Sequence, residues 1–393
     1  MEKPARPKVL VCLPFLTPAI GGGAFVLANL LEPLGRLGFD IQVLYFQEEA
    51  RDLVPPDLTT HFIPKRTGSA RFYAQYWGAA RRLAGILRDE RPDLILCNAY
   101  QPFWLALAAR RLSGLKTPVI TQEQNNLAQM FDGARWGALR LFLVRKLDPS
   151  AERIIVPAEG LARHVIELGI PEGKIARIPN PIPLERIRKL SPEPAGHPWF
   201  DSKDAPVLLN VGALEEQKDQ KTLLRAFAAL RAAGRDAGPP AAATARLAFV
   251  GDGPLRPALE AEAQRLGVRA DVAFLGLQKN PFKFMARADA FVLSSRYEGF
   301  GLVLAEAMAC GCPVVSTDCP YGPGEIVAHG DSGLLSPVRD AGALSDNVLK
   351  TLTDRALRER LVAGGLRRAE DFSSEAVAGK YAQLIRSCLR AQS

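Results

Sequence analysis

The apolar positions of this chain alternate between short continuous runs and longer stretches with helical spacing. The continuous runs have the length of buried strands and occupy residues 9–13, 41–46, 94–97, 119–121, 154–157, 207–211, 247–250, 272–275 and 290–293. Between the runs, apolar side chains recur three and four residues apart, as they do over residues 25–34. Strands that alternate with helices form parallel sheets covered on both faces, so both halves are predicted to be α/β.

A proline-rich stretch interrupts the alternation between the two halves. Proline disfavours helix and stiffens a connection, so a rigid, non-helical linker is expected there. The pattern predicts an N-terminal domain over residues 1–185, a linker over residues 186–204, a second domain over residues 205–370 and a terminal helical segment over residues 371–393.

Composition and cysteine usage are those of an ordinary soluble protein. Of 393 residues, 48% are hydrophobic and 23% are charged. The first apolar run is too short for a signal peptide or a membrane span, and no later run reaches about 18 residues, so a cytoplasmic location is expected. Six cysteines in a chain of this length form no disulfide framework. Cys310, Cys312 and Cys319 near His329 match no zinc spacing and are interpreted as buried small residues.

The positive charge of the chain is concentrated in its first half. Residues 1–190 hold 26 Lys and Arg against 18 Asp and Glu, which accounts for the whole formal charge of +8. A basic half suggests an anionic partner, such as phospholipid or a phosphorylated acceptor, but it is equally compatible with a soluble surface that has no special partner. No motif for nucleic-acid recognition accompanies the charge, so no nucleic-acid partner is predicted.

Two predicted helices combine aromatic and basic side chains. They cover residues 71–88, with Tyr76 and Trp77, and residues 136–147, with Phe142. Each is compatible with a helix that lies on an anionic membrane surface, such as the inner face of the cytoplasmic membrane. Each is also compatible with an ordinary amphipathic helix packed on the sheet, which is the favoured interpretation.

The most informative stretch follows the strand at residues 290–293. Glu298, Gly299 and Gly301 come after that strand, and a helical pattern then carries Glu306 about one turn inside it. A glycine loop at a helix start leaves backbone N–H groups open, and these groups and the helix dipole favour an anionic ligand. A pair of glutamates at this spacing also occurs on many solvated helices, so the pair alone identifies no site.

The residues around this pair resemble the retaining nucleotide-sugar glycosyltransferases of family 4, of the group 1 type found in bacterial cell-surface polysaccharide synthesis. The resemblance rests on Asn280-Pro281, Phe291-Val292-Leu293-Ser294-Ser295, Glu298-Gly299-Phe300-Gly301, Glu306-Ala307-Met308-Ala309, Pro313 to Asp318 and Gly322 to Ile326. It implies a GT-B fold, in which two Rossmann-like domains face each other across a cleft. It also implies that the final helix, residues 371–393, crosses back to the N-terminal domain.

The resemblance assigns donor-binding roles to residues of the second domain. Glu298 and the amides of Gly299, Phe300, Gly301 and Leu302 would face the sugar and the leaving diphosphate, and Glu306 would hold the ribose hydroxyls. Backbone from Gly276 to Asn280 would meet the nucleotide base. Gly212 and Lys218 match the turn that clamps the diphosphate.

Three positions depart from the family pattern or stand apart from common motifs. The diphosphate arginine expected after Gly212 is Ala213, for which Arg256 or Arg296 could substitute. The acceptor-side histidine is absent, and Glu123 is a candidate base in the loop that replaces it, where a plain polar loop is equally plausible. In the first domain, Gly22 and Gly23 follow the first strand without dinucleotide-motif or P-loop spacing; by resemblance this turn lies near the diphosphate and acceptor.

Together these features predict a metal-independent, retaining transferase without a cofactor. It would move a hexosyl or N-acetylhexosaminyl group from a nucleoside-diphosphate sugar, with UDP favoured, to a glycan or a lipid-diphosphate-linked acceptor. The catalytic candidates are Glu298, Lys218 and Glu123. A hydrolase with paired carboxylates and a non-catalytic sugar-nucleotide sensor, the latter suggested by Ala213, are the alternatives.

Overall fold

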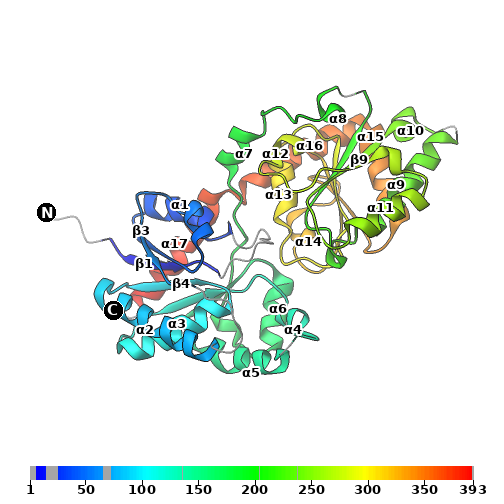
Figure 1. The fold of residues 1–393 in the computed structure, drawn as a ribbon. Helices are drawn as coiled ribbons and strands as arrows, with labels where there is room; N and C mark the ends of the chain where they lie inside the picture. The colour runs from blue at the N-terminus through cyan, green and yellow to red at the C-terminus, as the bar shows by residue number, and fades with distance from the viewer. Residues whose placement is uncertain are drawn as a thin grey trace. The chain divides into compact units, whose positions relative to one another are not determined.

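The computed structural model describes residues 6–14, 25–64, 72–134, 136–202, 204–236 and 238–391. The chain divides into two compact units (Figure 1). Unit 1 comprises Met1–Pro181 and Ser374–Ser393, and unit 2 comprises Ile182–Ser373. Each unit has its own sheet and its own hydrophobic core, as the alternation of strands and helices predicts.

Unit 1 contains a seven-stranded parallel sheet in the order β3-β2-β1-β4-β5-β6-β7. Every residue of β4 is buried, which explains why this strand is a continuous apolar run rather than an alternating one. The strands are β1 (Lys8–Cys12), β2 (Asp40–Tyr45), β3 (Thr59–Phe62), β4 (Leu94–Asn98), β5 (Val119–Gln122), β6 (Arg153–Val156) and β7 (Ile175–Arg177).

Helices cover both faces of this sheet, with α1 and α17 on one side and α2 and α3 on the other (Figure 1). The described helices of unit 1 are α1 (Leu31–Arg36), α2 (Phe72–Glu90), α3 (Tyr100–Ser113), α4 (Leu127–Phe131), α5 (Gly137–Leu147), α6 (Glu159–Glu167) and α17 (Ser374–Arg390). The terminal helix α17 inserts Val377, Tyr381 and Ile385 into the core of unit 1. The buried Tyr381 hydroxyl donates a hydrogen bond to Gln122 at the end of β5 (2.7 Å).

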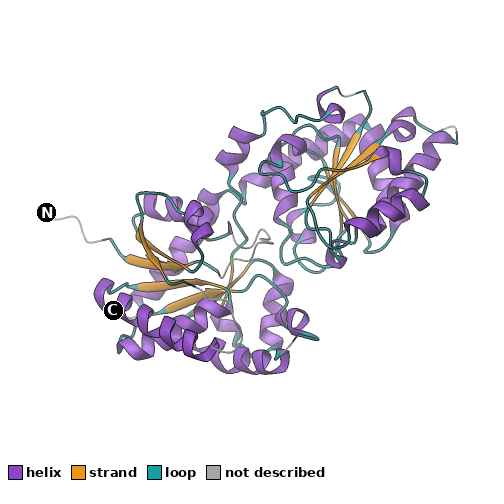
Figure 2. Ribbon diagram, viewed as in Figure 1, coloured by secondary structure: helices purple, strands orange, loops and turns teal. Residues whose placement is uncertain are grey.

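Unit 2 contains a six-stranded parallel sheet in the order β10-β9-β8-β11-β12-β13. Figure 2 shows strands in orange and the helices around them in purple. Its strands are β8 (Val207–Val211), β9 (Arg246–Val250), β10 (Val272–Phe274), β11 (Ala290–Leu293), β12 (Val314–Thr317) and β13 (Leu334–Ser336). The helices are α7 (Leu184–Leu190), α8 (Pro198–Asp201), α9 (Gln220–Arg235), α10 (Pro240–Thr244), α11 (Arg256–Arg265), α12 (Phe282–Met285), α13 (Leu302–Ala309), α14 (Pro323–Ile326), α15 (Ala341–Thr353) and α16 (Arg355–Glu370).

The stretch predicted as a non-helical linker is partly helical, and that part of the prediction is wrong. Helix α7 begins directly after Pro183, and Pro198 occupies the first turn of α8. Proline is compatible with these positions because the first N–H groups of a helix have no intrahelical acceptor. Leu184 and Ile187 of α7 are buried, and the helix packs against α12 and α13.

Candidate functional site

Loops after β8 and β11 meet at the carboxyl edge of the sheet in unit 2. The N–H of Arg296 donates to the Gln217 carbonyl (2.8 Å), and the Gln217 side chain donates to the Tyr297 carbonyl (3.0 Å). The Ser294 hydroxyl donates to the Lys218 carbonyl (2.8 Å). These reciprocal bonds connect two loops about 80 residues apart in sequence, because β8 and β11 are neighbours in the sheet.

Lys218 and Glu298 form an ion pair at this junction. The Lys218 Nζ lies 2.6 Å from Glu298 Oε1, and the Ser295 hydroxyl donates to the same oxygen (2.6 Å). The Glu298 side chain is 6% exposed and that of Lys218 is 20% exposed, so the pair is partly withdrawn from water. Charge-assisted bonds of this length fix the orientation of both side chains.

The glycine loop after Glu298 leads directly into α13. Gly301 caps the helix with φ of +91°, and the N–H groups of residues 299–303 donate no hydrogen bond within the described part of the chain. Five consecutive backbone donors at the N-terminus of α13 are therefore open, and they directly follow Glu298, the partner of Lys218. The Phe300 ring is buried against Phe372 (centroids 5.6 Å apart), so Phe300 offers its backbone, and its side chain anchors the loop.

Glu306 lies further along α13, on the side that packs against α7. Its apolar surroundings raise the pKa of its carboxyl to about 7, and the nearby Arg186 guanidinium of α7 opposes this shift. A carboxyl with this pKa is protonated in an appreciable fraction of molecules at neutral pH. The sequence interpretation does not include Arg186 among the site residues because this residue lies in the predicted linker.

Glycines bring the backbones of three loops together at the same edge. The Gly251 N–H donates to the Gly276 carbonyl (2.8 Å), and a Cβ on Gly251 would lie 2.0 Å from the Gly212 carbonyl oxygen. A Cβ on Gly212 would in turn be 3.7 Å from the Lys218 side chain. Glycine is required at Gly251 for both space and its φ of +136°.

The Asn280 side chain is occupied by hydrogen bonds within unit 2. It donates to the Leu190 carbonyl and to Glu193 (both 2.9 Å), and it accepts from the Phe282 N–H (3.1 Å). Any contact of Asn280 with a nucleotide base must therefore come from its backbone. In the same turn Leu277 is 80% exposed, which leaves an apolar side chain open beside Gly276.

The two arginines considered as substitutes for the missing diphosphate arginine already have acidic partners. Arg296 bonds to the buried Asp219 and to Glu216, at 3.3 and 3.2 Å. Arg256 lies within 3.6 Å of Asp252 and 3.3 Å of Glu260. Lys218 also has an acidic partner, but that partner is Glu298, which directly precedes the open amides at the start of α13, so this ion pair places the Lys218 ammonium at the loop.

Two family models match the chain. The model for glycosyl transferases group 1 matches residues 198–368, and the model for Glycosyltransferase Family 4 matches residues 20–186. Together they span most of the sequence, and the first contains all of the loops just described. The chain belongs to the group 1 glycosyltransferases.

Curated relatives of this glycosyltransferase include enzymes named for lipid-linked glycan and lipopolysaccharide synthesis. It is 27% identical to an N-acetylgalactosamine-N,N'-diacetylbacillosaminyl-diphospho-undecaprenol 4-alpha-N-acetylgalactosaminyltransferase of Campylobacter jejuni, over 91% of this chain and 94% of the relative. It is 35% identical to a lipopolysaccharide core biosynthesis glycosyltransferase of Rhizobium meliloti, over 47% of this chain and 51% of the relative.

Solved structures show that the glycosyltransferase has the GT-B fold. The HepE protein of Anabaena, crystallised with UDP and glucose, superposes with a TM-score of 0.75 at 19% identity, over 97% of this chain and 100% of that one. This likeness concerns the fold, and it agrees with the two Rossmann-like parallel sheets of units 1 and 2.

The acceptor-side candidates of the glycosyltransferase lie in unit 1. Glu123 follows β5 and is 1% exposed; burial, then the negative charge of Asp148, raises the pKa of its carboxyl well above the usual range. This shift disfavours the ionised form that a base requires, so the role of base for Glu123 stays a prediction. Asn126 caps α4 by accepting from the Gln129 N–H (3.0 Å). Gly22 and Gly23 lie outside the described residues.

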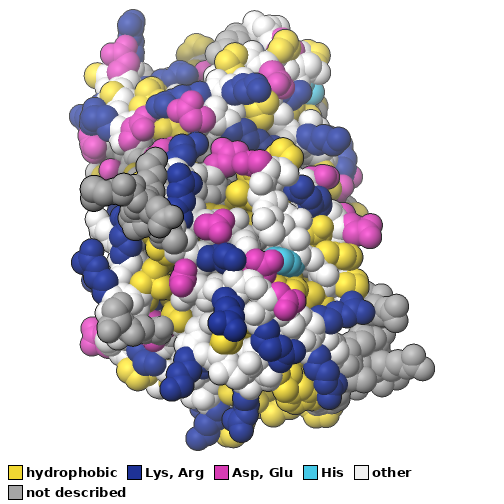
Figure 3. All heavy atoms as spheres, turned by 90° about the vertical axis from the view of Figure 1, so that its left-hand side faces the viewer, with side chains coloured by type: hydrophobic (Ala, Val, Ile, Leu, Met, Phe, Trp, Pro, Cys, Tyr) yellow, Lys and Arg dark blue, Asp and Glu magenta, His cyan; other side chains and the backbone are white. Residues whose placement is uncertain are grey.

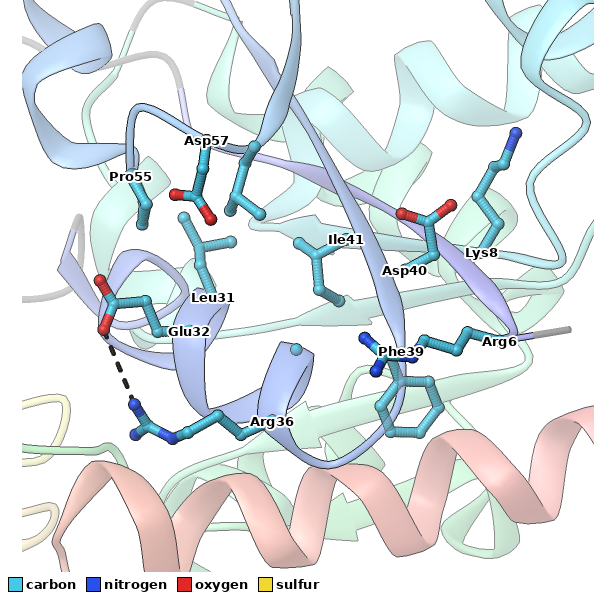
Figure 4. A pocket seen from close by; sticks show the side chains of 12 residues that line it. Arg6, Lys8, Leu31, Glu32, Arg36, Phe39, Asp40, Ile41, Pro55 and Asp57 are labelled. Carbon is cyan, nitrogen blue, oxygen red and sulfur yellow. Dashed lines mark ion pairs between the residues drawn. The ribbon is translucent and has the colours of Figure 1, made fainter. Parts of the chain in front are cut away.

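A hollow of about 860 Å³ on unit 1 does not suit the donor (Figure 4). It lies at the amino ends of β1 and β2, where Lys8 and Asp40 begin their strands, whereas doubly wound sheets bind ligands at the carboxyl ends. Acidic and basic side chains are mixed around it, including Glu32 and Arg36, which form an ion pair (3.8 Å).

None of the helices in the described ranges combines the length and the apolar character that a membrane crossing requires.

Proposed function

We propose that this glycosyltransferase transfers a hexosyl or N-acetylhexosaminyl group from a UDP-sugar to a glycan or a lipid-diphosphate-linked acceptor, with retention of anomeric configuration. The observation that carries the proposal is the Lys218–Glu298 pair beside the open amides of residues 299–303. A cation next to a run of open backbone donors at a helix N-terminus is suited to a diphosphate leaving group.

In this proposal Lys218 and the amides at the start of α13 neutralise the charge that develops on the leaving diphosphate. These donors are held in place by the loop–loop bonds at Gln217 and Ser294, so little reorganisation accompanies the reaction. Because protein groups supply this neutralisation, we propose that transfer requires no metal ion. Activity retained after chelation and dialysis would support this part.

Glu298 is assigned to orienting the donor sugar rather than to covalent catalysis. Its Oε1 already accepts from Lys218 and Ser295, which leaves Oε2 to accept a sugar hydroxyl. An oxygen engaged by an ammonium and a hydroxyl is a weak nucleophile, which disfavours a glycosyl-enzyme intermediate at that atom. The anomeric configuration of the product, read by NMR, tests the retention.

The proposed acceptor side in unit 1 contains a buried amide pair. Asn180 Nδ2 donates to Gln124 Oε1 (2.5 Å), while the buried Gln124 Nε2 and Asn180 Oδ1 have no partner among the described residues. The Campylobacter relative, whose name specifies a diphospho-undecaprenol acceptor, supports a lipid-linked acceptor.

A donor screen followed by a transfer assay tests the proposed function. We expect UDP-sugars to raise the melting temperature more than GDP- or ADP-sugars do, and we expect transfer to fall about 10²–10³-fold in Glu298→Gln while the donor still binds. Stabilisation by GDP-sugars alone would overturn the choice of base. Donor binding without turnover against any envelope glycan acceptor would favour the sensor that Ala213 suggests.

The raised pKa of Glu306 predicts a pH-dependent donor affinity. An ionised carboxylate accepts ribose hydroxyl bonds more strongly than a protonated carboxyl does. With a pKa of about 7, Glu306 loses its charge as pH falls, so UDP-sugar affinity should weaken about tenfold between pH 8 and pH 6. Calorimetry should show this dependence of UDP-sugar affinity on pH in the native protein and almost none in Glu306→Gln. An unchanged slope in the variant would assign the titration to another group.

A further inference from the structure

Helix α5 buries little of its apolar surface. Of its eleven residues, only Gly137 and Val144 are fully buried. By contrast, α2, the other helix with mixed aromatic and basic residues, packs Ala80, Leu83 and Leu87 into the protein. Packing therefore explains these three residues of α2, although Trp77 is 47% exposed, and it explains few of the apolar residues of α5.

The exposed residues of α5 form one stripe with an apolar part and a cationic part. Leu139 and Phe142 are 44% and 54% exposed, and Arg145 and Lys146 follow one turn later on the same side. Trp136, directly before the helix, is 64% exposed, and Met130 of α4 is 43% exposed. We call Met130, Trp136, Leu139, Phe142, Arg145 and Lys146 the α5 surface.

The basic residues of this surface lack acidic partners. Within the described ranges, Arg145 and Lys146 form no ion pair, whereas the exposed Arg355 pairs with Glu359 (2.7 Å). Asp132 is the sole acidic residue in the sequence from 127 to 147. In Figure 3, Lys and Arg side chains lie beside hydrophobic ones at the lower end of the view.

We propose that the α5 surface docks this glycosyltransferase on an anionic lipid bilayer. Trp, Phe and Leu enter the headgroup region, and Arg145 and Lys146 bind lipid phosphates, which is the arrangement of interfacial helices. A second copy of the chain fits less well, because a two-fold contact would bring the same uncompensated positive charges together. The inference rests on the proposed function in one respect: a lipid-linked acceptor places the reaction at such a surface.

Vesicle co-sedimentation of the full chain tests the docking. We expect binding to phosphatidylcholine vesicles that contain phosphatidylglycerol and little binding to phosphatidylcholine alone. Phe142→Ser and Lys146→Glu should each lower the partition coefficient at least about tenfold. Leu366→Ser and Lys350→Glu, which alter an exposed leucine and an exposed lysine of unit 2, are the matched controls and should bind as the native chain does.

Several outcomes would overturn the docking surface without touching the proposed function. These are no binding by the native chain, equal binding by Phe142→Ser, Lys146→Glu and the controls, or a concentration-dependent dimer that Phe142→Ser abolishes. Because Lys146 is exposed, Lys146→Glu should not disturb folding, and it tests the surface even if Phe142→Ser fails to fold. UDP-sugar stabilisation and transfer to a short-chain, water-soluble acceptor without vesicles report on the proposed function separately, and both should persist in the α5 variants.

Discussion

Replacing Lys218 with methionine should lower kcat/KM for the donor by about 10²–10³-fold, because it removes the cation expected to face the leaving diphosphate. It also leaves Glu298, whose side chain is 6% exposed, without its ammonium partner. A buried carboxylate without a partner costs about 3–5 kcal/mol of folding free energy. Steady-state kinetics with varied UDP-sugar and urea denaturation measure the two effects.

A double variant separates catalysis from stability. Lys218→Met/Glu298→Gln removes both charges, so it should recover much of the lost free energy of unfolding while transfer stays low. Lys221→Met, three residues later at the start of α9, is the matched control and should retain activity. If the double variant regained transfer together with stability, Lys218 would be a structural residue and its place at the diphosphate would be wrong.

Gly322→Ala should lower the free energy of unfolding by about 3–5 kcal/mol. A Cβ at this position would lie 2.0 Å from the Phe300 carbonyl oxygen, and the backbone has φ of +93°. The clash displaces the loop of residues 298–301, so donor binding should weaken as well. Urea denaturation with a check on the m-value measures the first effect, and calorimetry with a UDP-sugar measures the second.

Gly311→Ala isolates the contribution of the close approach. Gly311 has φ of +71°, but a Cβ there would meet no atom within 4 Å. This substitution should therefore cost only the left-handed backbone penalty of about 1–2 kcal/mol. Equal losses in Gly311→Ala and Gly322→Ala would show that the contact between residues 300 and 322 does not constrain the loop.

The local elements around the donor loop could be predicted from the sequence because their causes are local. The run at residues 290–293 is continuously apolar since β11 is buried on both faces, and Gly301 permits the left-handed cap that begins α13. Glu298 precedes this cap and Glu306 follows it within a few residues, so their positions relative to the helix start are also local. The prediction of a non-helical linker was wrong in part because proline at a helix start and proline in a rigid connection give the same sequence pattern.

Partnerships across the sheet could not be predicted in this way. Lys218 meets Glu298 because β8 lies beside β11 in the strand order, and that order is a property of the whole unit. Likewise, Asn280 donates to Leu190 at the end of α7 and to Glu193 just after it. The pKa of Glu123 is raised by its burial and by the charge of Asp148, which is distant in the sequence. Side-chain exposure and pKa depend on what the rest of the chain places nearby.

By itself the sequence determined two parallel α/β units, a glycine loop at a helix start with a glutamate on either side, and the resemblance to the family that the models matched. Only the tertiary structure decided which cation faces that loop, which carboxyls are buried, and that α5 leaves its apolar residues exposed. The physical reason is that backbone preference and hydrophobic periodicity act over a few neighbouring residues. Charge pairing and burial, in contrast, arise between residues that only the completed fold brings together.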